Sequence, residues 1–474
     1  MTNNSNNDYF KSEEFINNLR LYEDSQKAGG GCILSSDELA DIAEYYFEKG
    51  AAQKARGVAE YAISLYPDAT SPLVFLARFY INVKRDYKTA YKYISRITDT
   101  SALEYFTILI EYYLATGEYD KARQTFIEAE DDIDQEDSLY LILDTAYLLY
   151  DYGQTDEADK LKERIEDKES EDYLKMTARS LSERGDNEGA IEMLEKVIDK
   201  DPFNVDNWIL ISSLQLMADK YSDSATSAEY AIAIDDKQAD AYMNLGNSFF
   251  KMCNYTKALD AYDKYSKLSD NELGDILRAR CYFCMQDTAK AYQLLMVAKD
   301  KCTDNKNNLI DIYKDLAIVC GWSSKPETAF EYINLLKKEK YKDAELNLIE
   351  GSILLGMKKL EQANDVFTIG YELSTNKQEY LFQVAVSFYE HSYDKAAYLL
   401  FKEIFTRDPK RIRGLAYLAV TCNYLGFEDE FLKYLTIAVE KNPDEAKAVL
   451  GEMFPNSMQP YDYPEYARRT LGKK

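Results

Sequence analysis

Apolar and small residues recur at three- and four-residue spacings through most of this chain, as they do along amphipathic helices. The pattern is clearest where Tyr242, Leu245 and Phe249 fall on one face of a first helix. Small residues at Gly246 in that helix and Ala258 in the following helix would let the two backbones approach closely. The spacing therefore predicts a hairpin of two helices.

The hairpin pattern recurs along the chain at intervals mostly of about 32 to 38 residues. Copies with an alanine equivalent to Ala258 are marked by Ala90, Ala122, Ala158, Ala190, Ala291, Ala329, Ala363 and Ala397. Two further copies keep the register with Ser224 and Phe431 at that position. We count about twelve hairpins, the last of which ends near Pro443.

This motif set resembles the tetratricopeptide repeat family over roughly residues 35–443, because spacing and residue size agree together. The resemblance implies an all-α fold, a right-handed α-solenoid of about twelve helical hairpins with terminal capping helices. Residues 1–34 are expected to form an amphipathic capping helix and a Gly-rich linker, and residues 444–474 a capping helix and a tail. Three places depart from the family pattern and are candidate kinks: charged residues at the apolar positions 162 and 278, and residues 71–84, which lack a glycine turn.

Composition agrees with a folded helical chain, since 474 residues contain only 19 Gly and 9 Pro and are 46% hydrophobic. The formal charge of −26 repels nucleic acid and anionic lipid, so we expect neither nucleic acid nor a membrane as partner. The acidic balance favours a basic or amphipathic protein or peptide. An acidic surface can equally serve solubility alone, and this alternative stays open.

No motif of catalysis is present, and the repeats leave little room for a separate catalytic domain. We expect a protein that is not an enzyme, with no catalytic residue, cofactor or metal. Cys281 and Cys284 lie on one expected helix without further ligands, which favours packing over a zinc site. The single histidine, His391, is expected in a solvent-facing turn. Scattered cysteines, an odd number of them, and the polar amino terminus without a signal-like segment predict a cytoplasmic protein.

In the resembling family the first helices line a concave groove that binds peptides. Mapping that side onto this chain gives the candidate peptide-binding residues Phe75, Phe79, Tyr147, Tyr150, Lys175, Arg179, Leu210, Ser213, Met217, Asn244, Asn247, Phe250, Lys251, Arg280 and Phe283. Asn244 and Asn247 match asparagines that bind peptide backbone in some members. Each of these residues also has a structural explanation, as repeat consensus, packing or solvated surface.

Three functional hypotheses follow from the sequence. The first is a non-catalytic adaptor that binds a peptide or protein segment in the groove. The second is a scaffold or regulatory subunit that acts through self-association as a homo-oligomer. The third, an enzyme that uses acidic groove residues, is disfavoured because no carboxylate spacing singles out a pair.

Overall fold

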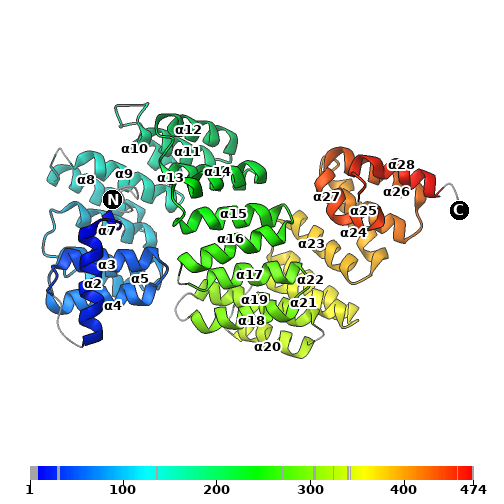
Figure 1. Cartoon of the computed structure of the whole chain (residues 1–474), viewed down its shortest axis with the longest axis horizontal. Coiled ribbons are helices and arrows are strands. Elements are labelled where there is room, and N and C mark those ends of the chain that lie inside the picture. Colours follow the sequence, from blue (N-terminus) through cyan, green and yellow to red (C-terminus); the bar gives the residue numbers. More distant parts are fainter. Residues whose placement is uncertain are drawn as a thin grey trace. The chain divides into compact units, whose positions relative to one another are not determined.

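Helices make up the regular structure of the described residues, which in this computed structural model are 9–28, 33–134, 137–269, 271–302, 306–323, 325–338, 341, 343–455 and 457–471. This part of the chain contains 27 α-helices, two short 3-10 helices and no strand (Figure 1). The predicted all-α fold is thereby confirmed. The Gly-rich linker expected around residues 29–32 lies outside the described residues.

The helices from α3 to α26 form twelve consecutive pairs. The first helices of the pairs are α3 (Ser36–Glu48), α5 (Thr70–Asn82), α7 (Leu103–Thr116), α9 (Ser138–Asp151), α11 (Glu171–Glu183), α13 (Val205–Met217), α15 (Ala239–Lys251), α17 (Leu273–Cys284), α19 (Lys306–Trp322), α21 (Ala344–Gly356), α23 (Lys377–Glu390) and α25 (Leu415–Tyr424). The second helices are α4 (Ala52–Leu65), α6 (Tyr87–Ile94), α8 (Tyr119–Asp132), α10 (Thr155–Lys162), α12 (Asn187–Lys200), α14 (Tyr221–Ile234), α16 (Tyr255–Leu268), α18 (Thr288–Lys301), α20 (Pro326–Lys338), α22 (Leu360–Leu373), α24 (Asp394–Arg407) and α26 (Glu428–Lys441).

Successive pairs are neighbours in space as well as in sequence. The first helix of one pair contacts the first helix of the next, as α3 contacts α5, α5 contacts α7 and α13 contacts α15. Most second helices also contact the first helix that follows them, as α14 contacts α15. A stack of similar units that touch their neighbours is an α-solenoid. The right-handed sense of its superhelix stays a prediction.

A left-handed backbone residue marks the turn inside most pairs. These residues are Gly50, Arg85, Gly117, Gly153, Gly185, Asp219, Cys253, Gln286, Lys358, Ser392 and Gly426. Neighbouring positions are 32 to 36 residues apart, except for one gap of two periods after Gln286. The pair α5–α6, expected to be irregular because it lacks a turn glycine, makes the same turn with Arg85 at φ 51°. The turn geometry is therefore kept even where the glycine is not.

Close approach of the two helices of a pair depends on small residues, as the sequence pattern predicted. A Cβ atom placed on Gly246 would lie 2.4 Å from Cε1 of the buried Tyr262 ring, in the second helix of the same pair. Gly351 stands in the same relation to Phe367, at 2.3 Å. Ala258, the small residue in the second helix of the pair that contains Gly246, is fully buried.

The two charged residues that interrupt the apolar pattern are accommodated by ion pairs. Arg278 Nη1 lies 2.8 Å from Asp263 Oδ1, and the same guanidinium also binds Asp275. The buried Lys162 Nζ lies 3.6 Å from Asp159 Oδ1 and over the ring of Tyr173. Helix α17 continues through Arg278, whereas α10 ends at Lys162 after 8 residues. The next helix pair follows in both cases, so neither residue interrupts the array of pairs.

Helices also cover the two ends of the array. At the start, α2 (Glu13–Ala28) contacts α3 and buries Phe15 and Tyr22 in the first hydrophobic cluster. At the end, α27 (Pro443–Leu450), the 3-10 turns Gly451–Met453 and Pro460–Asp462, and α28 (Tyr463–Leu471) follow the last pair. The segment expected as a tail thus contains a helix, because the ring of Tyr463 stacks on Phe454 at a centroid distance of 4.0 Å. The predicted domain boundaries at residues 34 and 443 stay predictions.

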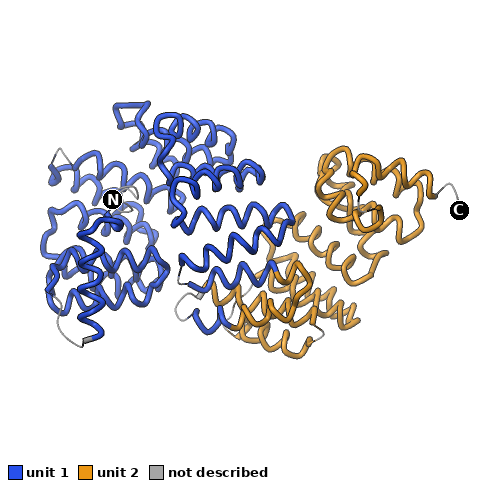
Figure 2. The backbone as a smooth tube through the Cα atoms, in the orientation of Figure 1, with its two compact units in different colours: residues 1–281, 297–306 blue, residues 282–296, 307–474 orange. Residues whose placement is uncertain are grey.

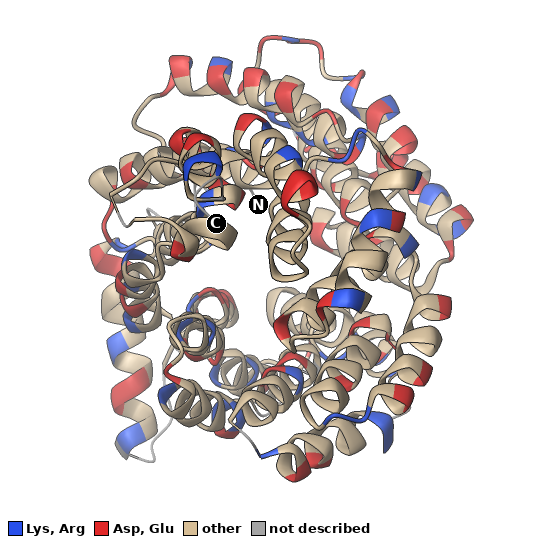
Figure 3. Ribbon diagram, turned by 90° about the vertical axis from the view of Figure 1, so that its right-hand side faces the viewer, with Lys and Arg blue, Asp and Glu red and all other residues tan. Residues whose placement is uncertain are grey.

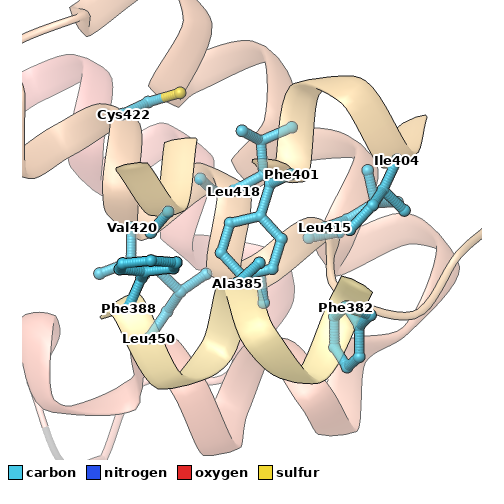
Figure 4. Close-up of a cluster of buried hydrophobic side chains, with 14 of the residues drawn as sticks. Phe382, Ala385, Phe388, Phe401, Ile404, Leu415, Leu418, Val420, Cys422 and Leu450 are labelled. Atoms are coloured by element: carbon cyan, nitrogen blue, oxygen red, sulfur yellow. The ribbon is translucent and has the colours of Figure 1, made fainter. Parts of the chain in front are cut away.

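The chain divides into two compact units (Figure 2). Unit 1 contains residues 1–281 and 297–306, and unit 2 contains residues 282–296 and 307–474. Each has its own hydrophobic clusters, built from the apolar stripes of successive helices. In unit 2 the largest cluster joins rings such as Phe382, Phe388 and Phe401 with aliphatic side chains from α25 (Figure 4). Because the apolar helix faces pack into these clusters, the clusters determine which faces of the helices are exposed to solvent.

Candidate functional site

The first helices of unit 1 carry many charged side chains away from the hydrophobic clusters. Lys, Arg, Asp and Glu are spread over many helices of the chain, so a site is defined by which charges face one another (Figure 3). We call the following set the inner face of unit 1: Asp41, Glu44, Glu48, Arg78, Glu111, Asp144, Asp151, Asp172, Lys175, Arg179, Asp206, Leu210, Met217 and Asp240. Nine of these residues are carboxylates and three are cations.

The inner face is concave, because the start of unit 1 curves back to its later helices. A Cβ atom placed on Gly50, in the turn after α3, would lie 2.8 Å from Asn271 Nδ2, just before α17. Lys11 Nζ lies 2.7 Å from Asp235 Oδ2, at the end of α14. The carboxylates of Asp206 and Asp240 raise the pKa of Glu48. Helix α3 therefore faces α13 and α15 across the inside of unit 1.

Desolvation raises the pKa of six carboxylates of the inner face although solvent reaches them: Asp41, Glu44, Glu48, Asp151, Asp172 and Asp240. Burial raises the pKa of Glu44, which Asp41 raises further and Arg78 lowers. Desolvation by the surrounding protein, followed by the neighbouring Glu44, raises the pKa of Glu48. Desolvation also raises the pKa of Asp240, which Lys49 lowers. Glu48 and Asp240 are exposed, yet the surrounding protein disfavours their charged forms.

Other charges of the inner face are paired within the fold. Arg78 Nε lies 3.0 Å from Oε2 of Glu111, whose side chain is only 4% exposed. Asn82 Nδ2 donates to the second oxygen of Glu111 at 2.7 Å. Desolvation by the surrounding protein lowers the pKa of Arg78, but the charge and hydrogen bond of Glu111 outweigh it and the net pKa is raised. This pair links α5 to α7 and stabilises the array.

The two predicted cations on α11 are likewise paired. Lys175 Nζ lies 2.7 Å from Glu171 Oε1, and Arg179 Nη2 lies 3.2 Å from Asp151 Oδ1 and 3.0 Å from Glu183 Oε1. Both were expected as groove residues. In this structure their charges are neutralised by neighbouring carboxylates.

Four of the predicted groove residues are buried. Phe75, Phe79 and Tyr150 belong to hydrophobic clusters between repeats. Asn244 is 4% exposed, and its Nδ2 donates to the carbonyl of Ile209 at 3.1 Å and to Ser213 Oγ at 2.8 Å. These side chains connect repeats, and their burial argues against direct contact with a peptide.

The second predicted asparagine has a partner within its own pair. The Tyr262 hydroxyl donates to Asn247 Oδ1 at 2.7 Å. Both asparagines thus use their amides inside the solenoid, Asn244 toward α13 of the preceding pair and Asn247 toward the second helix of its own pair. A peptide-backbone site on Asn244 and Asn247, carried over from the family, would need these hydrogen bonds to break.

The remaining predicted groove residues are open to solvent to different degrees. Leu210 and Met217 lie seven residues apart on α13 and are 39% and 62% exposed. Lys251 is exposed at the end of α15, while Tyr147, Ser213, Phe250 and Arg280 are partly buried. In unit 2, Phe283 packs edge-on against Trp322 at a centroid distance of 6.3 Å. Leu210 and Met217 therefore add an apolar strip to the carboxylates of unit 1.

The carboxylates Glu44, Glu48 and Asp240 were not among the predicted residues. Their signal in the sequence is the four-residue spacing of Glu44 and Glu48 on the polar side of α3. The sequence alone could not show that this side faces Asp206 and Asp240, because that depends on how far the array curves.

His391 corrects a second expectation. It ends helix α23, is partly buried, and stacks on the Trp322 ring at a centroid distance of 5.5 Å. Its Nε2 lies 3.0 Å from Ser352 Oγ. Burial and the charge of Lys358 lower its pKa, so the ring is neutral at pH 7. His391 thus lies in the turn after α23, as expected, but its ring is packed and does not face solvent.

Two further features of the described residues concern metal binding and membranes. Within them no group of three His, Cys, Asp or Glu side chains is placed to hold a metal ion. Cys281 is buried and Cys284 exposed, on the same helix α17. No helix in the described part is both long and apolar enough to cross a membrane.

Comparison with known sequences agrees with the repeat geometry. The sequence model of the tetratricopeptide repeat family matches residues 175–239, across α11 to α14. The turn residues recur every 32 to 36 positions, close to the period of that family. The chain resembles the tetratricopeptide repeat family. A relative, TPR repeat-containing protein YpiA of Bacillus subtilis (strain 168), is 22% identical over 390 residues, which cover 79% of this chain and 88% of the relative.

Three solved structures are also similar to this chain. Yeast Tom70 is 15% identical, with 92% of this chain and 96% of that chain covered and a TM-score of 0.45. The Cut9 and Hcn1 hetero-tetramer of the APC/C is 14% identical, with 95% of each chain covered and a TM-score of 0.38. MamA is 22% identical over 34% of this chain, with 95% of MamA covered and a TM-score of 0.31.

Proposed function

We propose that this tetratricopeptide repeat protein is a non-catalytic adaptor that holds a basic, amphipathic segment of a partner protein on the inner face of unit 1. Proteins of this repeat family generally mediate protein–protein interactions. The observation that carries the proposal is the set Glu44, Glu48 and Asp240. These carboxylates are desolvated, lie on a concave surface and have no ion-pair partner among the described residues.

The chemistry of the inner face favours a basic partner. Cations from a partner would relieve the repulsion that raises the pKa of Glu48 and would find carboxylates that already lack water. The strip of Leu210 and Met217 on α13 would meet apolar side chains of the same segment. Because Lys175 and Arg179 are already neutralised, an acidic segment would find few available cations here.

A peptide titration tests the proposal. A fluorescein-labelled amphipathic peptide that alternates lysine and leucine should bind the full chain, more weakly as salt is raised. The triple variant Glu44→Gln/Glu48→Gln/Asp240→Asn should weaken binding by about tenfold, since each lost partly buried charge contact contributes on the order of 0.5–1 kcal/mol. A matched variant neutralises three exposed carboxylates on second helices: Glu60→Gln/Glu192→Gln/Glu229→Gln.

Equal binding by the triple variant and its matched control would contradict the proposal. A preference for a glutamate–leucine peptide of the same length would contradict the sign of the partner's charge. Self-association, the second hypothesis, stays a prediction. It requires a mass above 54.6 kDa at low concentration, with the triple substitution leaving that mass unchanged. Cytoplasmic location also stays a prediction.

A further inference from the structure

Unit 2 presents a different surface at the carboxyl ends of its first helices. Trp322, at the end of α19, is 49% exposed, and Tyr424, at the end of α25, is 58% exposed. Exposed aromatic rings of this size on a well-packed solenoid are typical of binding surfaces. Between them along the array lies the end of α23, with the consecutive residues Tyr389, Glu390 and His391.

The rings on either side of Glu390 are organised by packing. His391 stacks on Trp322 with an interplanar angle of 28°. Tyr389 stacks on Tyr424 with an interplanar angle of 11° and a centroid distance of 6.3 Å. The first ring pair is anchored by the contact between His391 Nε2 and Ser352 Oγ, the second by the edge-on contact of Tyr389 with Tyr417.

A glycine allows the first ring pair to form across α21. Gly356 is the last residue of α21, and a Cβ atom placed on it would lie 3.3 Å from His391 Cε1. Because this position has no side chain, the His391 ring lies over the end of α21 and reaches Trp322. The aromatic surface is therefore continuous from α19 to α23.

Glu390 lies between the two ring pairs and points away from the core. Successive helix residues are separated by about 100°, so Glu390 falls between Tyr389 and His391 around α23. Phe388, on the far side of the helix, is buried against Phe367. Glu390 is exposed and shares this stripe with the exposed Gln383, seven residues earlier. Both sequence neighbours of Glu390, Tyr389 and His391, therefore belong to the two ring pairs.

Glu390 has no partner of opposite charge. Among the described residues no cation lies within ion-pair distance of it, and desolvation by the surrounding protein raises its pKa. The nearby Lys358 lies over the Tyr393 ring at 5.3 Å from the centroid. His391 is neutral at pH 7, so the ring next to Glu390 adds no positive charge. A desolvated carboxylate between aromatic faces matches a flat, weakly hydrated cation.

We propose that Glu390, between the Trp322–His391 and Tyr389–Tyr424 ring pairs, binds the guanidinium group of an arginine side chain on a partner peptide. The guanidinium would donate to the Glu390 carboxylate while its plane lies against an aromatic ring. This site lies in unit 2 and does not rest on the inner face of unit 1.

Trp322 provides a local reporter for the test. The chain has two tryptophans, so Trp208→Phe leaves Trp322 as the only one. In that background, titration with the blocked tripeptide Ac-Gly-Arg-Gly-NH2 should change the Trp322 emission in a saturable way. The citrulline tripeptide has the same shape without the charge and should bind at least about threefold more weakly, since a single exposed charge contact is modest.

Variants assign the signal to the site. Glu390→Gln should weaken arginine binding at least about threefold, and Tyr424→Ala should weaken it as well. Glu361→Gln, which removes an exposed carboxylate at the start of α22, should bind like the parent. The inner-face variant Glu44→Gln/Glu48→Gln/Asp240→Asn should also leave the Trp322 titration unchanged. Failure of one site is thereby distinguished from failure of the other.

Three results would overturn the proposal. The first is an emission change without saturation, and the second is equal affinity for the arginine and citrulline peptides. The third is an affinity for Ac-Gly-Lys-Gly-NH2 equal to that for the arginine peptide, which would show that a compact cation suffices and the planar guanidinium is not recognised.

Discussion

Units 1 and 2 are built from the same helix pairs but offer different chemistry on their first helices. In unit 1 the inner face gathers carboxylates such as Glu44, Glu48 and Asp240, which repel one another. In unit 2 the ends of the first helices carry the rings of Trp322 and Tyr424 around a single carboxylate, Glu390. The repeat framework fixes the core positions and leaves the solvent-facing positions free to differ.

The comparison separates two kinds of residue in a solenoid. Residues at the contact within a pair obey one rule in both units, as Gly246 with Tyr262 and Gly351 with Phe367 show. Residues at the solvent-facing positions of the first helices follow no common rule, because the packing of the pair does not constrain them. Function in such a fold is therefore expected where the units differ.

The largest effect should come from breaking what the units share. Gly246→Ala places a Cβ atom 2.4 Å from the ring of Tyr262, which is held by its hydrogen bond to Asn247. We expect a loss of about 1–3 kcal/mol from overpacking. Gly351→Ala, facing Phe367 at 2.3 Å, should cost a similar amount in unit 2. Urea unfolding followed by circular dichroism measures both.

A glycine without neighbours is the matched control. Gly57 lies in the interior of α4, and no atom comes within 4 Å of a Cβ placed there. Gly57→Ala should stabilise the chain by roughly 0.5–1 kcal/mol through helix propensity alone. If Gly246→Ala and Gly57→Ala shift the unfolding midpoint in the same direction, the close-approach explanation is wrong.

The next largest loss of stability depends on which partner of an ion pair is buried. In unit 1 the carboxylate of Glu111 is buried and Arg78 is exposed, whereas in unit 2 Lys314 is buried and its partners Asp343 and Glu345 are more exposed. Arg78→Met should cost about 2 kcal/mol, because it leaves a buried carboxylate without its cation. Lys314→Met should cost about 1 kcal/mol or less, because solvent reaches the carboxylates it leaves.

The double variant Arg78→Met/Glu111→Gln checks the cause of that loss. It removes the stranded charge, and Asn82 can still donate to the amide oxygen. We expect it to recover most of the stability lost in Arg78→Met. A double variant as unstable as the single one would show that Arg78 acts through the packing of its side chain.

Much of the scaffold could be predicted from the sequence, and less of the site. Gly246 and Ala258 predicted the helical hairpin, because small residues are required where two helix backbones approach closely. Asn244 and Asn247 were assigned to a groove on family pattern alone, whereas the structure uses both amides within the solenoid. Glu48 lies near Asp206 and Asp240 because the small rotations between successive helix pairs add up along unit 1. A short sequence pattern does not determine the total curvature of the array, so this proximity could not be predicted.

A smaller effect is expected from the acidity of the inner face. Desolvation raises the folded-state pKa values of Glu44, Glu48 and Asp240, so ionising them opposes folding at neutral pH. The penalty is complete above the raised folded-state values. It disappears as pH falls through them toward the unfolded values, about 3.9 for Asp and 4.3 for Glu.

The variant Glu44→Gln/Glu48→Gln/Asp240→Asn tests this expectation. It should be more stable than the parent at pH 7, by less than about 1 kcal/mol once solvent screening is considered. The advantage should shrink as the pH is lowered. Thermal unfolding measured from about pH 7 down to about pH 4, close to the reference pKa values of the carboxyls, checks this. A gain that is independent of pH would mean that the charges themselves are not the cause.

The smallest effect concerns the aromatic surface of unit 2 and separates its geometry from its stability. Gly356→Ala puts a Cβ atom 3.3 Å from His391 Cε1, so the His391 ring must shift by a few tenths of an ångström. The change in stability should stay within about 0.5 kcal/mol. The Trp322 emission should nevertheless change, because the His391 ring stacks on it. Gly57→Ala should leave that emission unaltered. An unaltered Trp322 signal in Gly356→Ala would show that the ring pair does not depend on this glycine, and the aromatic surface would then owe its continuity to Ser352 instead.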